Sequence, residues 1–219
     1  TMSEIDLLEN YPKTQRKVEE RAEVKTEEDR KIARQFGQEY FDGDRRFGYG
    51  GYSYQPRFWQ PVVPTFIDYY GLDEESSILD VGCGKGFMLH DFALALPEAA
   101  LKGIDASQYA VTNAIEKVKS VISVGNAKEL PFEDKSFDLV ISINTIHNLP
   151  IEECKQALRE IQRVSRRDAF ITVDAYRTPE EKIRMDAWNL TAQTYMHVDE
   201  WKKLFKEVGY EGDYYWFIP

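Results

Sequence analysis

The chain contains 219 residues, with 38 acidic and 28 basic side chains, and its formal net charge is −10. This charge argues against nucleic-acid substrates, because proteins that neutralise phosphates present a basic surface. The sequence contains no apolar run of about 20 residues, and residues 1–4 show no secretion signal. We therefore expect a cytoplasmic protein that binds neither membranes nor nucleic acids.

Residues 1–60 differ in composition from the rest of the chain. The first 46 residues are highly charged and indicate a solvated helical arm. From Phe47 to Trp59, glycines punctuate a dense cluster of aromatic residues, which excludes a regular helix. Two interpretations stay open for these rings. They cover a sheet edge, or they form a cap over a binding cleft, with substrate contacts from Tyr49, Tyr52 and Tyr54.

A short apolar strand that ends in Asp80 leads into a turn containing Gly82, Gly84 and Gly86. Glycines remove the Cβ atoms where a backbone must approach a ligand. The third glycine comes one residue too early for the dinucleotide fingerprint, and Lys85 lacks the following Ser or Thr of a Walker loop. A carboxylate at the strand end would repel a pyrophosphate but attract an ammonium and a sulfonium. This turn therefore predicts a site for S-adenosylmethionine.

The segment from Asp80 to Gly86 resembles the first motif of the class I S-adenosylmethionine-dependent methyltransferases. The resemblance extends from about residue 75 to residue 175. It implies an α/β fold with a doubly wound, mostly parallel, Rossmann-like sheet that has helices on both faces. Apolar positions that recur through residues 110–118 and 154–164 support the expected alternation of strands and helices. We assign the methyltransferase domain to residues 61–219.

A second strand, Leu101 to Ile104, ends at Asp105 about 20 residues past the glycines, where an acid can bind both ribose hydroxyls. The resemblance places the next apolar segment against the adenine. It assigns cofactor contacts to Ala106, Asn126, Ala127 and Asn144. Asn126 stands where the family usually has Asp, and its side-chain carbonyl can still accept a hydrogen bond from the adenine amino group.

The strand Leu139 to Ile143 is followed by residues that the resemblance places between cofactor and substrate. We hypothesise that His147 is the general base, or that it orients the acceptor, because histidine suits proton transfer at neutral pH. The alternative, a histidine that caps a helix or contacts backbone, is equally open. Asp174, at the end of the next strand, has a comparable claim.

The last region contains a lid-like helical insert at residues 175–200, after the fifth strand. Pro179 and two following glutamates are typical of a helix start. The insert offers Tyr176, Tyr195 and His197 as substrate contacts, although Tyr195 and His197 could simply pack the lid. Residues 213–218 predict a final strand. Because the family usually has two strands here, the sequence leaves the seventh strand open.

Together these features predict a methyltransferase that acts at an oxygen or nitrogen of a small polar metabolite, such as a sugar. Two rival functions stay open, a methyltransferase for protein or peptide side chains and a non-catalytic partner subunit that binds the cofactor. Cys83 and Cys154 suggest neither a disulfide framework nor a metal cluster. The sequence does not decide between a monomer and a homodimer.

Overall fold

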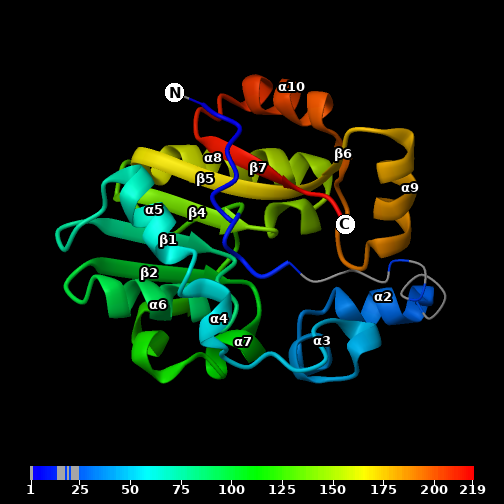
Figure 1. Cartoon of the computed structure of the whole chain (residues 1–219), viewed down its shortest axis with the longest axis horizontal. Helices are drawn as coiled ribbons and strands as arrows, with labels where there is room; N and C mark the ends of the chain where they lie inside the picture. Colours follow the sequence, from blue (N-terminus) through cyan, green and yellow to red (C-terminus); the bar gives the residue numbers. More distant parts are fainter. Residues whose placement is uncertain (1, 14–17, 19, 21–24) are drawn as a thin grey trace.

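The computed structural model describes residues 2–13, 18, 20 and 25–219. Within these residues the chain forms a seven-stranded sheet of order β3-β2-β1-β4-β5-β6, in which β7 also pairs with β5 (Figure 1). All the strand pairings are parallel, which confirms the predicted doubly wound sheet. The strands are β1 (Ser77–Val81), β2 (Ala100–Asp105), β3 (Ile122–Val124), β4 (Phe137–Ile143), β5 (Ser165–Tyr176), β6 (Met196–His197) and β7 (Asp213–Phe217).

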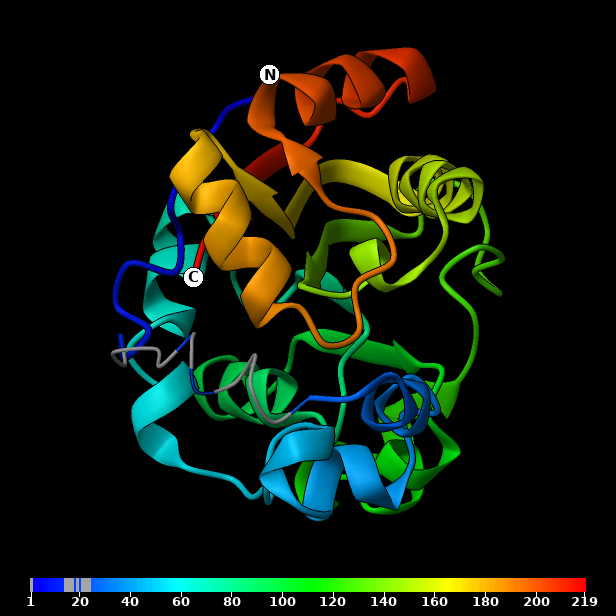
Figure 2. The same cartoon turned by 90° about the vertical axis from the view of Figure 1, so that its right-hand side faces the viewer.

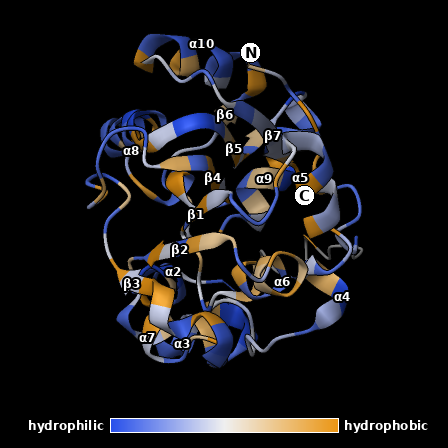
Figure 3. Ribbon diagram, turned by 90° about the vertical axis from the view of Figure 1, so that its left-hand side faces the viewer, coloured by the Kyte–Doolittle hydropathy of each residue, from blue (hydrophilic) through white to orange (hydrophobic). Residues whose placement is uncertain are grey.

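The central strands are apolar on both faces, as expected for a parallel sheet covered by helices on two sides. Ile78 packs into one apolar core and Leu79 into the other, and the same alternation recurs in β4 and β5. Figure 3 shows the hydrophobic residues along these strands. The helices that contribute to the first core are α5 (Val63–Tyr70) and α6 (Phe87–Ala95), and those that contribute to the second are α8 (Ile151–Val164) and α10 (Val198–Val208).

The apolar run 110–118, predicted as one helix, is split in the structure. Helix α7 (Gln108–Thr112) is followed by a 3₁₀ turn, η2 (Glu116–Val121). Between them Ile115 is extended, with φ −61° and ψ 133°. Its backbone N–H donates to the carbonyl of Lys85 at 2.9 Å. This tertiary hydrogen bond replaces a bond within the helix and ties the segment to the glycine turn.

The N-terminal region is less helical than the sequence suggested. Part of the predicted arm, residues 14–17, 19 and 21–24, lies outside the described residues. Residues 2–13 contain no helix. Residues 3–5 run beside β7, where the Ile5 N–H donates to the Tyr214 carbonyl and the Tyr214 N–H donates to the Ser3 carbonyl, both at 3.0 Å. The short helices that follow are α2 (Glu27–Ala33), α3 (Gln38–Asp42), η1 (Arg45–Phe47) and α4 (Pro56–Trp59).

The C-terminal region has the predicted insert and both strands that follow it. Helix α9 (Pro179–Trp188) begins at the predicted proline, with Thr178 as its N-cap. The two-residue β6 lies inside the predicted lid, and β7 pairs with β5 from Phe170 to Asp174. The described chain thus provides the seventh strand that the sequence left open.

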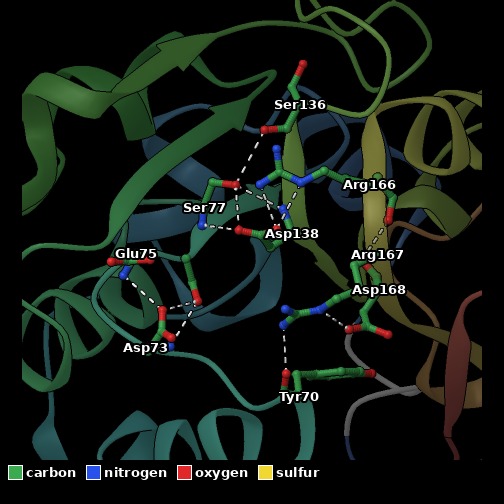
Figure 4. Close-up of polar contacts among 11 residues, drawn as sticks. Tyr70, Asp73, Glu75, Ser77, Ser136, Asp138, Arg166, Arg167 and Asp168 are labelled. Carbon is green, nitrogen blue, oxygen red and sulfur yellow. Dashed lines mark hydrogen bonds and ion pairs between the residues drawn. The ribbon is translucent and has the colours of Figure 1, made fainter.

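A polar network fixes the strands at the amino end of the sheet, opposite the carboxyl ends (Figure 4). Asp138 accepts hydrogen bonds from the Ser77 N–H at 2.9 Å and from the Arg166 guanidinium at 2.7 Å. Partial burial would raise the pKa of Asp138, but these hydrogen bonds outweigh it and lower the pKa. The network joins β1, β4 and β5 and so holds their register.

Candidate functional site

A cavity of about 820 Å³ lies at the carboxyl ends of the strands, where open α/β sheets bind ligands. Figure 2 views this edge, with α9 and the loop after it in orange, and α2 and α3 in blue. The cavity walls come from three parts of the chain. The first part consists of the strand ends and turns at 80–84, 104–106 and 125–127, and the second of segments 143–145 and 148–150 with Arg177 and Gln193. The third part consists of the two terminal segments and residues 36–59, which include the aromatic cluster and are called the aromatic cap from here on.

The glycine turn lies directly on the cavity through Gly82 and Gly84, which both have positive φ, 83° and 56°. A Cβ on Gly82 would lie 2.0 Å from Thr145 Oγ1, so no larger residue fits. Gly86 does not appear among the lining residues. It is the N-cap of α6, and a Cβ there would lie 2.5 Å from Ile122 Cδ1. Two glycines therefore shape the ligand surface, while the third permits close helix packing.

Two carboxylates line the cavity: Asp80, which is buried near the end of β1, and Asp105, which is partly buried at the end of β2. Burial, and then repulsion from Asp105, raise the pKa of Asp80 to about 7. Burial also raises the pKa of Asp105, although this carboxylate accepts the Gly84 N–H at 2.7 Å and the Ser107 N–H at 2.9 Å. A ligand with positive charge would restore the ionised form of Asp80.

The other predicted cofactor residues, Ala106, Asn126, Ala127 and Asn144, also line the cavity. Asn126 Oδ1 accepts the Lys128 N–H at 2.9 Å, which closes a tight turn at this wall. Asn144 has φ 50°, a left-handed conformation that asparagine tolerates better than most residues. Its side-chain carbonyl accepts the Thr172 hydroxyl at 2.9 Å. The structure thus places eight of the nine predicted cofactor residues on one surface.

His147 and Asp174 contact each other but are not among the described residues that line the cavity. The His147 Nδ1 accepts the Asp174 backbone N–H at 2.9 Å, so its proton resides on Nε2. The His147 carbonyl accepts the N–H groups of Gln193 and Thr194, both at 2.9 Å. Burial lowers the pKa of His147, and the Asp174 charge opposes this only partly. His147 thus contacts backbone, as in the alternative role, and its catalytic role stays a prediction.

The six residues predicted to contact substrate separate into two groups. Tyr49 and Tyr52 line the cavity, and their rings stack at 4.4 Å. Burial, then Tyr49, Tyr11 and the negative charge of Asp80, raise the pKa of Tyr52 well above its usual range. Tyr52 thus lies beside a predicted cofactor residue, at the donor end of the cavity.

The remaining four lie elsewhere within the described structure. The Tyr54 hydroxyl donates to Asp91, and the Tyr195 hydroxyl donates to Asp186 at 2.8 Å. His197 Nδ1 accepts the Asp199 N–H at 3.0 Å and caps α10, while Tyr176 packs edge-on against the His197 ring. The contacts of Tyr195 and His197 are those that packing of the lid requires, and a substrate role for these four residues stays a prediction.

Several lining residues were not predicted from the sequence. Tyr11 packs against Phe58 and Trp59, with ring centroids 5.3 and 5.0 Å apart, and so brings the N-terminal segment to the cavity. Arg177 directly follows the end of β5, and this position at the carboxyl end of a strand is the sequence signal that could have predicted it. The other lining residues come from segments far from the glycine turn in sequence, and they include Phe36, Tyr40, Gln193 and residues 215–218.

Within the described ranges, no three His, Cys, Asp or Glu side chains are grouped so that they could hold a metal ion. None of the helices in the same ranges is both long enough and apolar enough to cross a membrane.

Comparisons with known proteins agree with this geometry. Residues 79–173 match the methyltransferase domain family. The chain is 28% identical over 163 residues to the uncharacterized methyltransferase YcgJ of Bacillus subtilis, covering 66% of this chain and 62% of that protein. It is 37% identical over 119 residues to the demethylmenaquinone methyltransferase of Staphylococcus aureus, covering 50% and 46%. The chain therefore spans less than two thirds of the length of these relatives.

The fold also matches a solved structure of this kind. The crystal structure of YcgJ superposes with a TM-score of 0.53, covering 67% of this chain and 66% of that one at 24% identity, which shows a shared fold. The methyl donor of the family is S-adenosylmethionine. Residues 79–173, which include the glycine turn and the acids Asp80 and Asp105, are thus identified as a segment of the class I S-adenosylmethionine-dependent methyltransferase domain.

Proposed function

We propose that this protein transfers the methyl group of S-adenosylmethionine to an oxygen or nitrogen of a small polar metabolite. The observation that carries the proposal is one continuous cavity, lined by the glycine turn, by the acids Asp80 and Asp105 and by a second set of polar and aromatic side chains. The methyl donor of the domain family is S-adenosylmethionine, and the second set of side chains forms a surface on which an acceptor can bind.

The residues of the glycine turn suit the donor. Gly82 and Gly84 present backbone without side chains to the cavity, and the Tyr52 hydroxyl lies 3.0 Å from the position that a Cβ on Gly84 would take. Asp105 is positioned by two backbone N–H groups, which leaves lone pairs for ribose hydroxyls. Asp80 provides the negative charge that a sulfonium and an ammonium require. When bound, S-adenosylmethionine supplies an electrophilic methyl group on a positively charged sulfur.

The size and enclosure of the cavity favour a small acceptor. A volume of about 820 Å³ is in the upper range for a pocket that holds one drug-sized ligand. Donor and acceptor must share it. Residues 6–13, the aromatic cap and residues 215–218 enclose the outer part. Asn148, Gln193 and Arg177 provide polar groups for a hydroxylated or amine acceptor.

Positioning is the chemistry that this chain can supply. Methyl transfer needs the acceptor atom in line with the sulfur–methyl bond, and correct placement alone contributes up to about 7–11 kcal/mol in intramolecular reactions. His147 fits this scheme as a positioning residue, because its carbonyl holds Gln193 and Thr194 beside the cavity while its ring holds the end of β5.

Label transfer tests the proposal directly. The protein is incubated with methyl-labelled S-adenosylmethionine and a metabolite extract, and labelled products are identified by mass spectrometry. We expect label in a small hydroxylated or amine metabolite, and Asp105→Ala as the matched variant should lose it. Label in the protein fraction instead would overturn the small-acceptor assignment. Absence of label from every fraction would overturn the catalytic one.

A further inference from the structure

The aromatic cap is joined to the glycine turn by one carboxylate. Asp42, the last residue of α3, accepts from Lys85 Nζ at 2.7 Å, from the Tyr109 hydroxyl at 2.5 Å and from the Tyr52 N–H at 2.9 Å. Lys85 Nζ donates a second hydrogen bond to the Tyr52 carbonyl at 2.7 Å. Asp42 is thus the common partner of the cap, the glycine turn and α7.

These contacts hold aromatic rings over the donor end of the cavity. The Tyr52 ring lies on Gly84, packs 4.6 Å from the Phe87 ring and stacks on Tyr49. Lys85 stands between Gly84 and Gly86, so any shift of its backbone changes the surface that receives the cofactor. The cap and the cofactor surface therefore cannot move independently while Lys85 contacts Asp42.

The charges of Lys85 and Asp42 favour the arrangement in which the aromatic cap lies over the cavity. The Lys85 side chain is 10% exposed and that of Asp42 is 28% exposed. Within the described residues, Asp42 is the carboxylate that pairs with Lys85. Partial burial alone would raise the pKa of Asp42, but the hydrogen bonds from Lys85, Tyr109 and Tyr52 lower it. Opening of the cap would break this ion pair and the hydrogen bond from Lys85 to the Tyr52 carbonyl.

Further anchors extend the cover across the site. The Phe36 carbonyl accepts the Ser107 hydroxyl at 2.5 Å, next to the turn that positions Asp105. At the other side of the cavity, Lys25 Nζ donates to the carbonyls of Trp188 and Asn189, both at 2.6 Å, at the end of α9. The segment 25–52 therefore passes from α9 to α7 across the carboxyl edge of the sheet, as Figure 2 shows.

We propose that Asp42 and Lys85 are positioning residues that latch the aromatic cap over the bound cofactor, so that the cofactor leaves only when their contact opens. The proposal rests on cofactor binding in this cavity, which is part of the proposed function. It predicts that breaking the latch accelerates dissociation of the cofactor while changing its association much less. A contact that only stabilised the fold would change neither rate in the folded protein.

Dissociation kinetics test the latch in the full chain. S-adenosylhomocysteine, the product that remains of the cofactor after methyl transfer, serves as the probe. Protein loaded with the tritiated compound is mixed with an excess of the unlabelled compound, and the label that stays bound is counted over time. We expect Asp42→Asn and Lys85→Met each to release the label about tenfold faster, the factor that corresponds to about 1.4 kcal/mol. The double variant should release it no more than about twofold faster than either single variant, because each change removes the same contact.

Two surface substitutions provide matched controls. Asp68→Asn and Lys102→Met remove the same charges at exposed positions, on α5 and β2, and should leave the dissociation rate unchanged. Cap opening itself is read by trypsin cleavage at Arg45 and Arg46, which are exposed on the cap. S-adenosylhomocysteine should protect these sites in the wild type and not in Asp42→Asn.

The outcomes separate the two levels of inference. A wild type that fails to bind S-adenosylhomocysteine would overturn the proposed function and the latch with it. A wild type that binds, with variants that dissociate at the wild-type rate, would overturn the latch alone. Additive effects in the double variant would also contradict it, since they would place Asp42 and Lys85 in separate contacts.

Discussion

Replacing Gly82 by alanine tests how closely the backbone of the glycine turn is packed. The new Cβ would lie 2.0 Å from Thr145 Oγ1 and 2.3 Å from Thr145 Cγ2. A left-handed conformation costs a non-glycine residue about 1–2 kcal/mol, and overpacking adds about 1–3 kcal/mol. Gly82 has φ 83°, so we expect Gly82→Ala to lower the free energy of unfolding by about 2–5 kcal/mol.

Gly71 provides a matched control for the conformational part. It also has positive φ, 61°, but nothing lies within 4 Å of the Cβ that alanine would add. Gly71→Ala should therefore lose only the conformational part, about 1–2 kcal/mol. For a chain of this size each kcal/mol corresponds to about 2–4 °C in melting temperature.

Urea and thermal unfolding measure both variants under one set of conditions. Gly82→Ala should unfold at lower urea and lower temperature than Gly71→Ala. Thr145→Gly in the Gly82→Ala background should recover part of the difference, because it removes the atoms that collide. Equal destabilisation of the two alanine variants would refute the reasoning, since it would mean that Thr145 moves aside without cost.

Three further predictions concern the carboxylates and His147. Asp105→Asn should weaken binding of S-adenosylhomocysteine at least tenfold in calorimetry, because an amide replaces a charged acceptor of about 1.5–3 kcal/mol per hydrogen bond; unchanged affinity would remove the ribose assignment. The pKa of Asp80 is raised to about 7 in the free protein, so near pH 6 a positively charged cofactor must expel a proton. Calorimetry in buffers of different ionisation enthalpy should therefore show proton release with S-adenosylmethionine, affinity that falls as pH drops below 7, and neither effect in Asp80→Asn. His147→Leu should cost about 1–3 kcal/mol of stability by leaving the buried Asp174 N–H without its acceptor. Residual turnover of this variant should keep the wild-type pH profile, and loss of the decline in rate at acid pH would instead show that His147 is the general base.

The parts of this structure that the sequence predicts well are those encoded by short, contiguous patterns. A buried strand, a terminal acid and spaced glycines specify one turn, because each residue acts on its immediate neighbours. The same holds for Pro179, which begins α9 as expected. The sheet order follows once the strands and helices alternate. Ala106, Asn126, Ala127 and Asn144 came instead from the family resemblance. Eight of the nine residues predicted to bind the cofactor line one cavity, and the exception, Gly86, lies in the same turn as Gly82 and Gly84.

The parts that the sequence could not predict depend on contacts between distant segments. The backbone contact of the His147 ring is made with Asp174, which lies 27 residues away on β5. The break between α7 and η2 is decided by the Lys85 carbonyl, which captures the Ile115 N–H. Tyr11 reaches the cavity because its ring packs on Phe58 and Trp59. None of these choices has a local signal, because each depends on which distant partner the fold supplies.

The hydrogen bonds between residues 3–5 and β7 have a consequence for how copies of this protein meet. An uncovered strand edge is a template onto which another chain can add. Here the Tyr214 N–H and carbonyl, which such a neighbour would need, are already occupied by Ser3 and Ile5. A shortened chain beginning at residue 7 would bare that template, and light scattering should then reveal self-association that the longer chain resists.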